Sequence, residues 1–476
     1  MKVVLTRPNY HSHLITPQLG IGYISSYLKK NGVDCFIVDG LNHGLTNYEI
    51  LDRCKDADVV GINCLSDYYP AVADLSRLLR SRGKTVVIGG AHPSVLPHET
   101  LKGTEADYVV VGEGEETMSE LVAAIARGGP TDAIPGVCSR ETKEFERRDY
   151  IKDLDSLPFP DWEEMDPRTY KKAPHGGFVK KFPVAPVTST RGCPYVCTFC
   201  ASPEIWGRRI RYRSPANVVD EIEYLVREYR VKEIHFEDDN LTLKRSHVEG
   251  ICELILERDI KVSWATPNGI RVDTITPKLL KLMKRSGCYF IAFGIESGND
   301  EILRNINKET DLATITYAVR EAKKAGMLTQ GFFIFGLPGE TERTIARTVE
   351  YAKSIPLDKA QFLLLDVLPG SGIWKDLRQW HTPDPTRRSY QQVSWVPDSI
   401  QRDFLEAAPS KAFKKFFLRP RQVYTALKYI KPSQFNFVVR RMADFGIIPG
   451  AAKKDPAPPH RTPGLPKTGA AGNKVR

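Results

Sequence analysis

The chain has 476 residues, of which 41% are hydrophobic and 26% are charged, as in ordinary globular proteins. A single hydrophobic core seldom grows beyond about 250–300 residues, so this length predicts two or three domains. The strongest apolar runs, residues 332–337 and 362–365, are far shorter than the roughly 20 residues that cross a bilayer. Nine cysteines do not make a disulfide framework in so long a chain, and no signal peptide is visible, so we expect a reduced, cytoplasmic protein.

The net charge of +10 is concentrated at one end of the chain. Residues 411–476 contain 15 Lys and Arg against two Asp, a net charge of +13, which leaves −3 for the remainder. The basic character therefore belongs to the C-terminal segment and not to the rest of the chain. This segment could contact an anionic partner, namely an acidic electron donor, a phosphorylated substrate or a lipid surface at the membrane periphery. We favour the alternative, in which it is a solvated surface with a flexible tail.

The first 140 residues alternate short apolar strands with helices. The expected strands are 3–6, 35–38, 59–63, 86–88 and 108–111, and the expected helices are 19–30 and 71–80. Continuous apolar strands are typical of a parallel sheet that is covered on both faces. Residues 1–140 therefore predict a doubly wound, Rossmann-like α/β domain, which binds ligands at the carboxyl ends of its strands.

Residues 141–186 are rich in charge and proline and predict a linker, and a second alternation of strands and helices occupies residues 187–375. The expected strands are 187–190, 232–236, 261–265, 289–294, 331–336 and 361–367, and the expected helices are 216–229, 246–258, 277–286, 312–325 and 342–354. Six such units suffice for a partial (β/α)6 barrel, whose chemistry lies at the carboxyl ends of its strands. A mainly helical segment at 376–450, with a basic helix at 413–429, and a disordered basic tail at 451–476 complete the prediction.

Three cysteines follow the first barrel strand, in the run Arg191-Gly-Cys193-Pro-Tyr-Val-Cys197-Thr-Phe-Cys200. Three thiolates spaced C-x3-C-x2-C can hold one corner of a cubane 4Fe-4S cluster and leave the fourth iron without a protein ligand. A zinc knuckle or inert buried thiols are the alternatives. Structural zinc needs a fourth Cys or His nearby, and the next candidates, His235 and Cys252, fall within predicted regular structure. We therefore predict a cluster with an open iron at the mouth of the barrel.

With this loop the chain resembles, over roughly residues 1–375, the radical S-adenosylmethionine (SAM) enzymes that carry an N-terminal cobalamin-binding domain. The cysteines match the C-x3-C-x-Φ-C signature of that superfamily, in which the open iron chelates the amine and carboxylate of SAM. The resemblance places Phe199 beside the adenine, together with the backbone of residues 331–340.

The resemblance also implies polar contacts with SAM at the strand ends. It assigns the acidic run Glu237, Asp238 and Asp239 to the methionine amine, which three carboxylates suit electrostatically. It assigns Glu296 to the ribose hydroxyls, and Arg271 is a candidate for the methionine carboxylate. The alternatives are a solvated loop for the acidic run and an ordinary surface ion pair for Arg271.

The N-terminal domain carries glycines at its strand ends, where they would let a flat macrocycle approach the backbone closely. The cobalamin contacts that the resemblance implies are Asn63, Gly89, Gly90, Gly112, Glu113 and Gly114. The loop with His11 and His13 does not fit the D-x-H-x-x-G motif of domains that ligate cobalt through histidine, so the chain resembles the subgroup without that ligand. A doubly wound domain that has lost its ligand is the alternative.

The function implied by this resemblance is methylation of an unactivated carbon of a small-molecule or natural-product substrate. A low-potential donor such as flavodoxin or ferredoxin would reduce the cluster, SAM would yield a 5′-deoxyadenosyl radical, and the substrate radical would take methyl from methylcobalamin. The runner-up uses the same cofactors for cyclisation, ring contraction or oxidation without methyl transfer.

The sequence leaves two further functions open. A transfer-RNA methylthiotransferase would need three N-terminal cysteines for a second cluster and a C-terminal β-barrel, whereas Cys35, Cys54 and Cys64 lie in or beside predicted elements. We therefore expect no nucleic-acid partner. A non-enzymatic electron carrier or regulator would bind the cluster without cleaving SAM.

Overall fold

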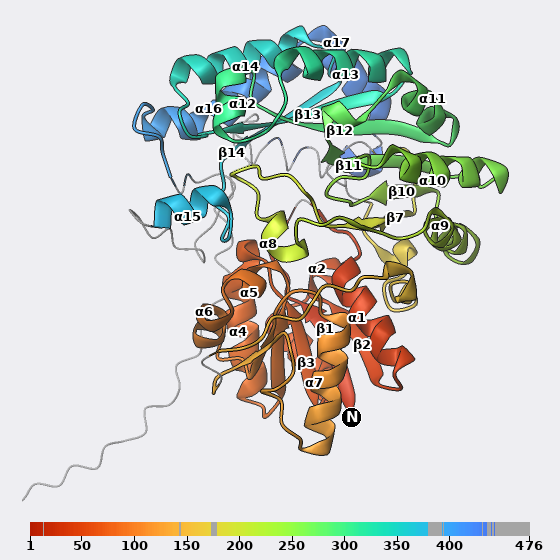
Figure 1. The fold of residues 1–476 in the computed structure, drawn as a ribbon, viewed down its shortest axis with the longest axis vertical. Coiled ribbons are helices and arrows are strands. Elements are labelled where there is room, and N and C mark those ends of the chain that lie inside the picture. The colour runs from red at the N-terminus through yellow and green to blue at the C-terminus, as the bar shows by residue number, and fades with distance from the viewer. Residues whose placement is uncertain are drawn as a thin grey trace, which may run out of the picture.

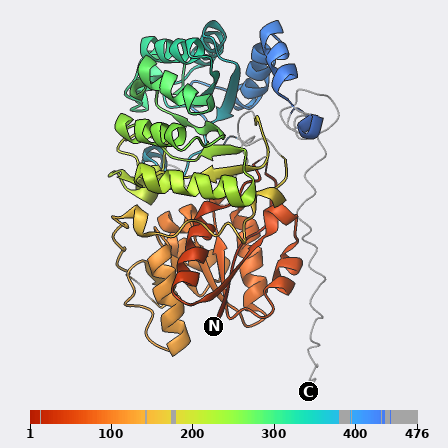
Figure 2. The same ribbon diagram turned by 90° about the vertical axis from the view of Figure 1, so that its right-hand side faces the viewer.

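The computed structural model describes residues 1–12, 14–141, 144–172, 179–378, 393, 395–430, 432–435, 439 and 442. Two α/β domains lie against each other, with the N-terminal domain below the barrel domain in Figure 1 and in the turned view of Figure 2. The predicted tail at 451–476 and His13 lie outside the described residues. No described helix is both long enough and apolar enough to cross a membrane.

The N-terminal domain is built on a six-stranded sheet. Its strands, in spatial order, are β2 (Asp34–Asp39), β1 (Lys2–Arg7), β3 (Val59–Asn63), β4 (Thr85–Gly89), β5 (Tyr108–Val110) and β6 (Val137–Ser139). The first five are parallel, and the short edge strand β6, which was not predicted, runs antiparallel to β5.

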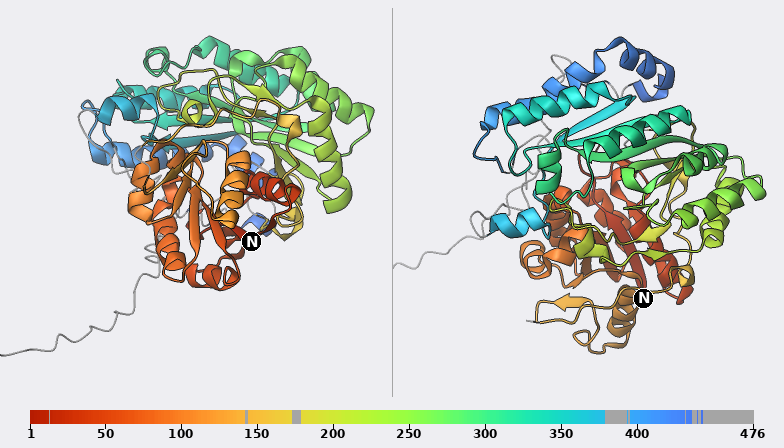
Figure 3. Two further views of the ribbon diagram at one scale, coloured as in Figure 1. Left: turned by 60° about the horizontal axis from the view of Figure 1, so that its bottom comes forward. Right: turned by 45° about the horizontal axis from the view of Figure 1, so that its top comes forward.

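Both faces of this sheet are covered, as the continuous apolar strands predict. One face packs on α1 (Leu19–Lys30) and α7 (Glu115–Arg127), and the other on α3 (Asn47–Arg53), α4 (Tyr69–Arg80) and α6 (Pro97–Thr104). Figure 3 shows these strands between helices on two sides. The predicted doubly wound domain is therefore confirmed.

The second domain is an open barrel of six parallel strands. Their spatial order is β14 (Lys359–Leu364), β13 (Leu328–Phe335), β12 (Cys288–Glu296), β11 (Ser263–Ile270), β10 (Glu233–Phe236) and β7 (Val184–Val187). The longer helices between them are α9 (Pro215–Tyr229), α10 (Arg245–Glu257), α11 (Pro277–Arg285), α13 (Leu312–Lys324) and α14 (Glu342–Ser354), and the short helix α12 (Asp300–Asn305) precedes α13. Because β14 and β7 are the two edges of the sheet, the partial (β/α)6 barrel is confirmed.

The first barrel strand begins earlier than predicted, at Val184 and not at residue 187. After Val187 the chain leaves the sheet, because Ser189 and Thr190 donate hydrogen bonds to a carboxylate of the next strand end, Asp238. The segment Thr190–Arg191 (β8) then pairs antiparallel with Arg211–Tyr212 (β9). The cysteine loop therefore lies between two strands that close on each other.

The residues predicted as a linker are packed against both domains. Asp161 accepts a hydrogen bond from Ser25 of α1 at 2.6 Å, and the indole of the buried Trp162 donates to Glu221 of α9 at 3.0 Å. This segment therefore fixes the N-terminal domain to the barrel.

The basic helix predicted at 413–429 is two helices, α16 (Arg402–Phe417) and α17 (Pro420–Tyr429). The break falls at Leu418 and Arg419, because Pro420 cannot donate a helical hydrogen bond and disfavours the helical conformation of the residue before it. α16 packs on the barrel through the buried Leu405 and Phe416.

Candidate functional site

The three cysteines of the loop differ from the other six. Cys193, Cys197 and Cys200 are partly exposed, whereas Cys35, Cys54, Cys64, Cys138, Cys252 and Cys288 are buried. The loop is held through Thr198, whose N–H donates to the carbonyl of Ile306 at 3.0 Å and whose carbonyl accepts from Ile373 at 2.8 Å. The sequence-predicted ligands therefore share one anchored loop at the carboxyl end of β7.

The loop suits a cluster better than a single metal ion. Among the described residues, no three His, Cys, Asp or Glu side chains converge as ligands of one ion would. A cubane does not require such convergence, because each thiolate binds a different iron. Burial raises the pKa of all three thiols, that of Cys200 to about 12, so iron must displace a proton from each.

Two aromatic side chains of the loop each face a cation from the barrel. The guanidinium of Arg271 lies 3.5 Å from the ring centre of Tyr195, and the ammonium of Lys308 lies 5.8 Å from that of Phe199. Burial raises the pKa of Cys197, and the nearby Lys308 charge opposes this effect. The cysteine loop is thus flanked by two positive charges.

The guanidinium of Arg271 makes its hydrogen bonds to other groups of the protein. It donates two hydrogen bonds to Asp273, at 3.0 and 2.8 Å, and one each to the carbonyls of Lys308 and Glu309, at 2.9 and 3.0 Å. These bonds occupy most of its five N–H groups. This arrangement favours the ion-pair alternative for Arg271 over contact with the methionine carboxylate of SAM.

The acidic run after β10 divides into two sets. Glu237 and Asp239 line a cavity between the domains, and Asp239 accepts a hydrogen bond from Ser202. Asp238 is 2% exposed, and its Oδ1 accepts from the N–H and hydroxyl of Ser189 and from the hydroxyl of Thr190. The contact of all three carboxylates with one amine therefore stays a prediction. Asp238 braces the turn after β7.

Glu296 ends β12 in a left-handed conformation, with φ of 66°, which is uncommon for a residue other than glycine. Its Oε1 lies 2.7 Å from Nζ of Lys308, and both side chains are less than 10% exposed. Strained backbone of this kind gathers at functional sites. Sequence reasoning missed Lys308, since a single lysine after a short helix carries no distinguishing pattern.

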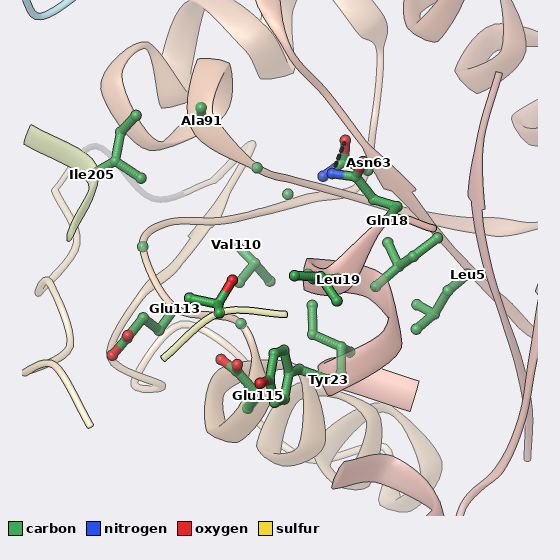
Figure 4. Close-up of a pocket in the computed structure, with 18 of the residues that line it drawn as sticks. Leu5, Gln18, Leu19, Tyr23, Asn63, Ala91, Val110, Glu113, Glu115 and Ile205 are labelled. Carbon is green, nitrogen blue, oxygen red and sulfur yellow. Dashed lines mark hydrogen bonds between the residues drawn. The ribbon is translucent and has the colours of Figure 1, made fainter. Parts of the chain in front are cut away.

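The predicted cobalamin contacts meet the barrel at a cavity of about 400 Å³ between the two domains. Asn63, Gly89, Gly90, Gly112, Glu113 and Gly114 line it from the N-terminal domain, and Pro186, Thr188, Trp206, Glu237 and Asp239 line it from the barrel side. Figure 4 shows Asn63 beside Gln18, whose amide donates to Asn63 Oδ1 at 3.5 Å. The loop residue His11 is exposed and is not among the lining residues.

Glu113 has a second role that its sequence context did not reveal. Its carboxylate accepts from Arg191 at 2.9 Å and from Arg211 at 2.8 Å, and from the N–H of Ile151 at 2.8 Å. Arg191 also pairs with Glu115 at 2.6 Å. Figure 4 shows Glu113 and Glu115 at one end of the cavity. These buried charges connect the N-terminal domain to the cysteine loop.

Comparison with known proteins agrees with this two-domain site. The B12 binding domain matches residues 10–122, and the Radical SAM superfamily matches residues 187–352. An uncharacterized methyltransferase of Pyrococcus horikoshii is 31% identical over 446 residues, which cover 88% of this chain and 93% of that protein. The chain belongs to the cobalamin-dependent radical SAM family.

Other relatives of this cobalamin-dependent radical SAM protein are named for different reactions. A cytidylyl-2-hydroxyethylphosphonate methyltransferase of Streptomyces wedmorensis is 28% identical, over 88% of this chain and 90% of that protein. An anaerobic magnesium-protoporphyrin IX monomethyl ester cyclase of Rubrivivax gelatinosus is also 28% identical, over 88% and 78%.

Two solved structures share the fold. The methyltransferase TsrM of Kitasatospora setae superposes with a TM-score of 0.68 at 19% identity, over 90% of this chain and 89% of TsrM. The enzyme OxsB superposes with a TM-score of 0.70 at 15% identity, over 93% of this chain and 71% of OxsB.

Proposed function

We propose that this protein binds a 4Fe-4S cluster, SAM and cobalamin, and that it methylates an unactivated carbon of a small-molecule or natural-product substrate. The observation that carries the proposal is the cavity between the domains. It is lined on one side by the glycine-rich strand ends of the B12 binding domain, and on the other by the acidic end of β10. A cobalamin bound against those glycines would face a SAM whose amine meets that acidic end.

The chain's own residues have distinct parts in this proposal. Cys193, Cys197 and Cys200 hold the cluster, and Glu237 and Asp239 neutralise the methionine amine of SAM. Glu296 binds the ribose hydroxyls, and Phe199 and the backbone of residues 331–340 contact the adenine.

The N-terminal domain supplies the surface for cobalamin. Gly89, Gly90, Gly112 and Gly114 leave room for the macrocycle, and Asn63 offers an amide to it. When bound, the three cofactors supply the electron transfer, the radical and the methyl group, whereas the protein supplies position and excludes water.

The test requires no knowledge of the substrate. Protein reconstituted with iron, sulfide and hydroxocobalamin is incubated anaerobically with a low-potential reductant, flavodoxin or dithionite, and SAM labelled in its methyl group. We expect 5′-deoxyadenosine in the solution and label on the extracted cobalamin. Formation of 5′-deoxyadenosine with no label on cobalamin contradicts methyl transfer.

That second outcome supports the runner-up, which is cyclisation, ring contraction or oxidation with the same cofactors. The similarity to the magnesium-protoporphyrin ester cyclases, at the same identity as the phosphonate methyltransferase, is the observation that favours it.

The methylthiotransferase alternative is not supported. Cys35, Cys54 and Cys64 are at most 1% exposed, and they lie in or after three separate elements of the N-terminal domain. The described part of the C-terminal segment is helical.

A further inference from the structure

The C-terminal helices α16 and α17 carry a basic outer surface. Residues 407–430 contain six Lys and Arg and no Asp or Glu. α16 packs on the barrel through buried residues such as Phe416, whereas Lys411, Lys414 and Lys415 are exposed. Residues three and four apart in a helix are neighbours, so these three lysines form one positive face.

Bulky apolar side chains are exposed on the same two helices. Leu418, at the junction of α16 and α17, is 73% exposed, and Val423 and Tyr424 of α17 are 44% and 67% exposed. The polar Gln422 is buried instead, and its amide donates to the carbonyl of Leu357 at 3.1 Å. α17 thus buries a polar residue against the barrel and exposes apolar ones, which is the reverse of an ordinary surface helix.

The exposed apolar side chains are concentrated here and lie among positive charges. In the part of the chain that the structure describes, eleven large hydrophobic side chains are strongly exposed, and four of them fall within residues 418–435: Leu418, Val423, Tyr424 and Phe435. Tyr424 lies three residues after Arg421 and four before Lys428, so it stands between two cations on one face of α17. Single exposed apolar residues are normal, but a group of them marks an interaction surface.

This surface lies at the end of the barrel opposite to the cysteine loop. Arg419 donates to the carbonyl of Lys353 at 2.8 Å, so the junction of α16 and α17 contacts the segment that leads into the amino end of β14. The cysteine loop follows the carboxyl end of β7, about 20 Å away if a six-residue strand separates the two ends. Figure 1 shows α17 at the top of the barrel domain and α8 (Ser202–Trp206), which follows the loop, beside the N-terminal domain. An electron donor or a substrate must reach the cluster end, so neither fits this surface.

We propose that the outer surface of α16 and α17 binds an anionic lipid bilayer, with Leu418, Val423 and Tyr424 at the depth of the headgroups and the lysines and arginines against lipid phosphates. Basic residues are attracted to an anionic leaflet, and tyrosine suits its interface because the ring is apolar and the hydroxyl reaches water. α17 has ten residues, and no described helix can cross a membrane, so the contact is peripheral. The exposed apolar residues distinguish this surface from the solvated one that the sequence alone favours.

The test measures the binding of the full-length, anaerobically reconstituted protein to vesicles by flotation. One set of vesicles is equimolar phosphatidylcholine and phosphatidylserine, and the other is phosphatidylcholine alone. We expect wild type to bind the anionic vesicles about tenfold more tightly or better, and to lose this advantage at high salt. The double variant Lys414→Gln/Lys415→Gln should weaken binding to anionic vesicles about tenfold, and so should Leu418→Ser/Tyr424→Ser. Wild type that binds neither vesicle, or both equally, would overturn the proposal.

Matched controls come from exposed positions on other helices. Lys278→Gln/Lys281→Gln removes two exposed lysines of α11, and Tyr48→Ser removes a tyrosine of α3 that is 61% exposed. Both should bind anionic vesicles as wild type does, and urea unfolding should show all variants to be as stable as wild type. If Leu418→Ser/Tyr424→Ser also binds as wild type, the surface recognises phosphates by charge alone, as a nucleic-acid contact would, and the bilayer is the wrong partner. Binding that survives in both test variants places the lipid contact outside α16 and α17 and contradicts the proposal.

Discussion

Arg191 donates a hydrogen bond to Glu113 at 2.9 Å, and the two side chains are 8% and 3% exposed. Arg191 stands two residues before the first cysteine of the loop, and Glu113 follows β5 of the B12 binding domain. The contact joins residues 78 positions apart in the chain. It therefore sets how the cysteine loop faces the cavity between the domains.

Substitution of Glu113 by Gln should destabilise the protein strongly. The change leaves Arg191 and Arg211 buried with one carboxylate fewer, and removing one partner of a buried ion pair costs about 3–5 kcal/mol. Urea unfolding of the metal-free protein measures this loss in the free energy of unfolding. The control is Glu350→Gln, because the Glu350 side chain is 62% exposed and the loss of its ion pair with Lys353 should cost less than about 1 kcal/mol. Equal, small effects of both variants would show that Glu113 does not hold the domains together.

Substitution by alanine should have different effects at two adjacent glycines of the cavity wall. Gly90 has φ of 116° and ψ of −170°, a region that only glycine occupies readily, and a Cβ there would lie 2.7 Å from the carbonyl of Cys64. At Gly89 the nearest atom to a Cβ would be 3.8 Å away, an ordinary contact.

Gly90→Ala should therefore lower the free energy of unfolding by about 1–3 kcal/mol and weaken hydroxocobalamin binding. Gly89→Ala should change the stability by no more than about 0.5 kcal/mol. Urea unfolding and the visible spectrum of bound hydroxocobalamin report the two effects. A Gly90→Ala protein as stable as the Gly89→Ala protein would show that this strand end is less constrained than the structure indicates.

The buried Asp238 should make stability depend on pH. Burial raises the pKa of its carboxyl from 3.8 to about 6, although hydrogen bonds from Thr190 and Ser189 oppose the rise. Between about pH 4 and 6 the folded state keeps a proton that the unfolded state has lost, so stability falls as the pH rises through this window.

The shift corresponds to about 3 kcal/mol, and Asp238→Asn should remove that share of the pH dependence. Urea unfolding of metal-free wild type and variant from pH 4 to 7 gives the difference between the two curves. Parallel curves, or a wild type that gains stability relative to the variant as the pH rises, would contradict the raised pKa.

Local sequence signals were sufficient for the elements and the ligand loop. The helix predicted at residues 19–30 has those bounds in the structure, because Asn31 ends it and Gly32 takes a left-handed conformation there. Continuous apolar strands predicted the first parallel sheet, and six strands in alternation with helices predicted the second. The start of β7 was missed because Pro183 and Pro186 made its residues resemble the linker.

The side-chain partnerships of the site could not be read in the same way. Arg191 with Glu113 and Arg271 with the carbonyl of Lys308 join residues that only the folded chain brings together. A run of three carboxylates in a sequence likewise does not show that Asp238 accepts hydrogen bonds from Ser189 and Thr190.

The most direct test of the whole account is the iron content of single cysteine variants after anaerobic reconstitution, measured with the formation of 5′-deoxyadenosine from SAM. We predict that Cys193→Ala, Cys197→Ala and Cys200→Ala each lose most of the cluster iron and all detectable SAM cleavage. Cys252→Ala, which alters a buried core cysteine, should keep both. Iron and cleavage that survive in any of the three loop variants would contradict the assignment of the cluster to this loop.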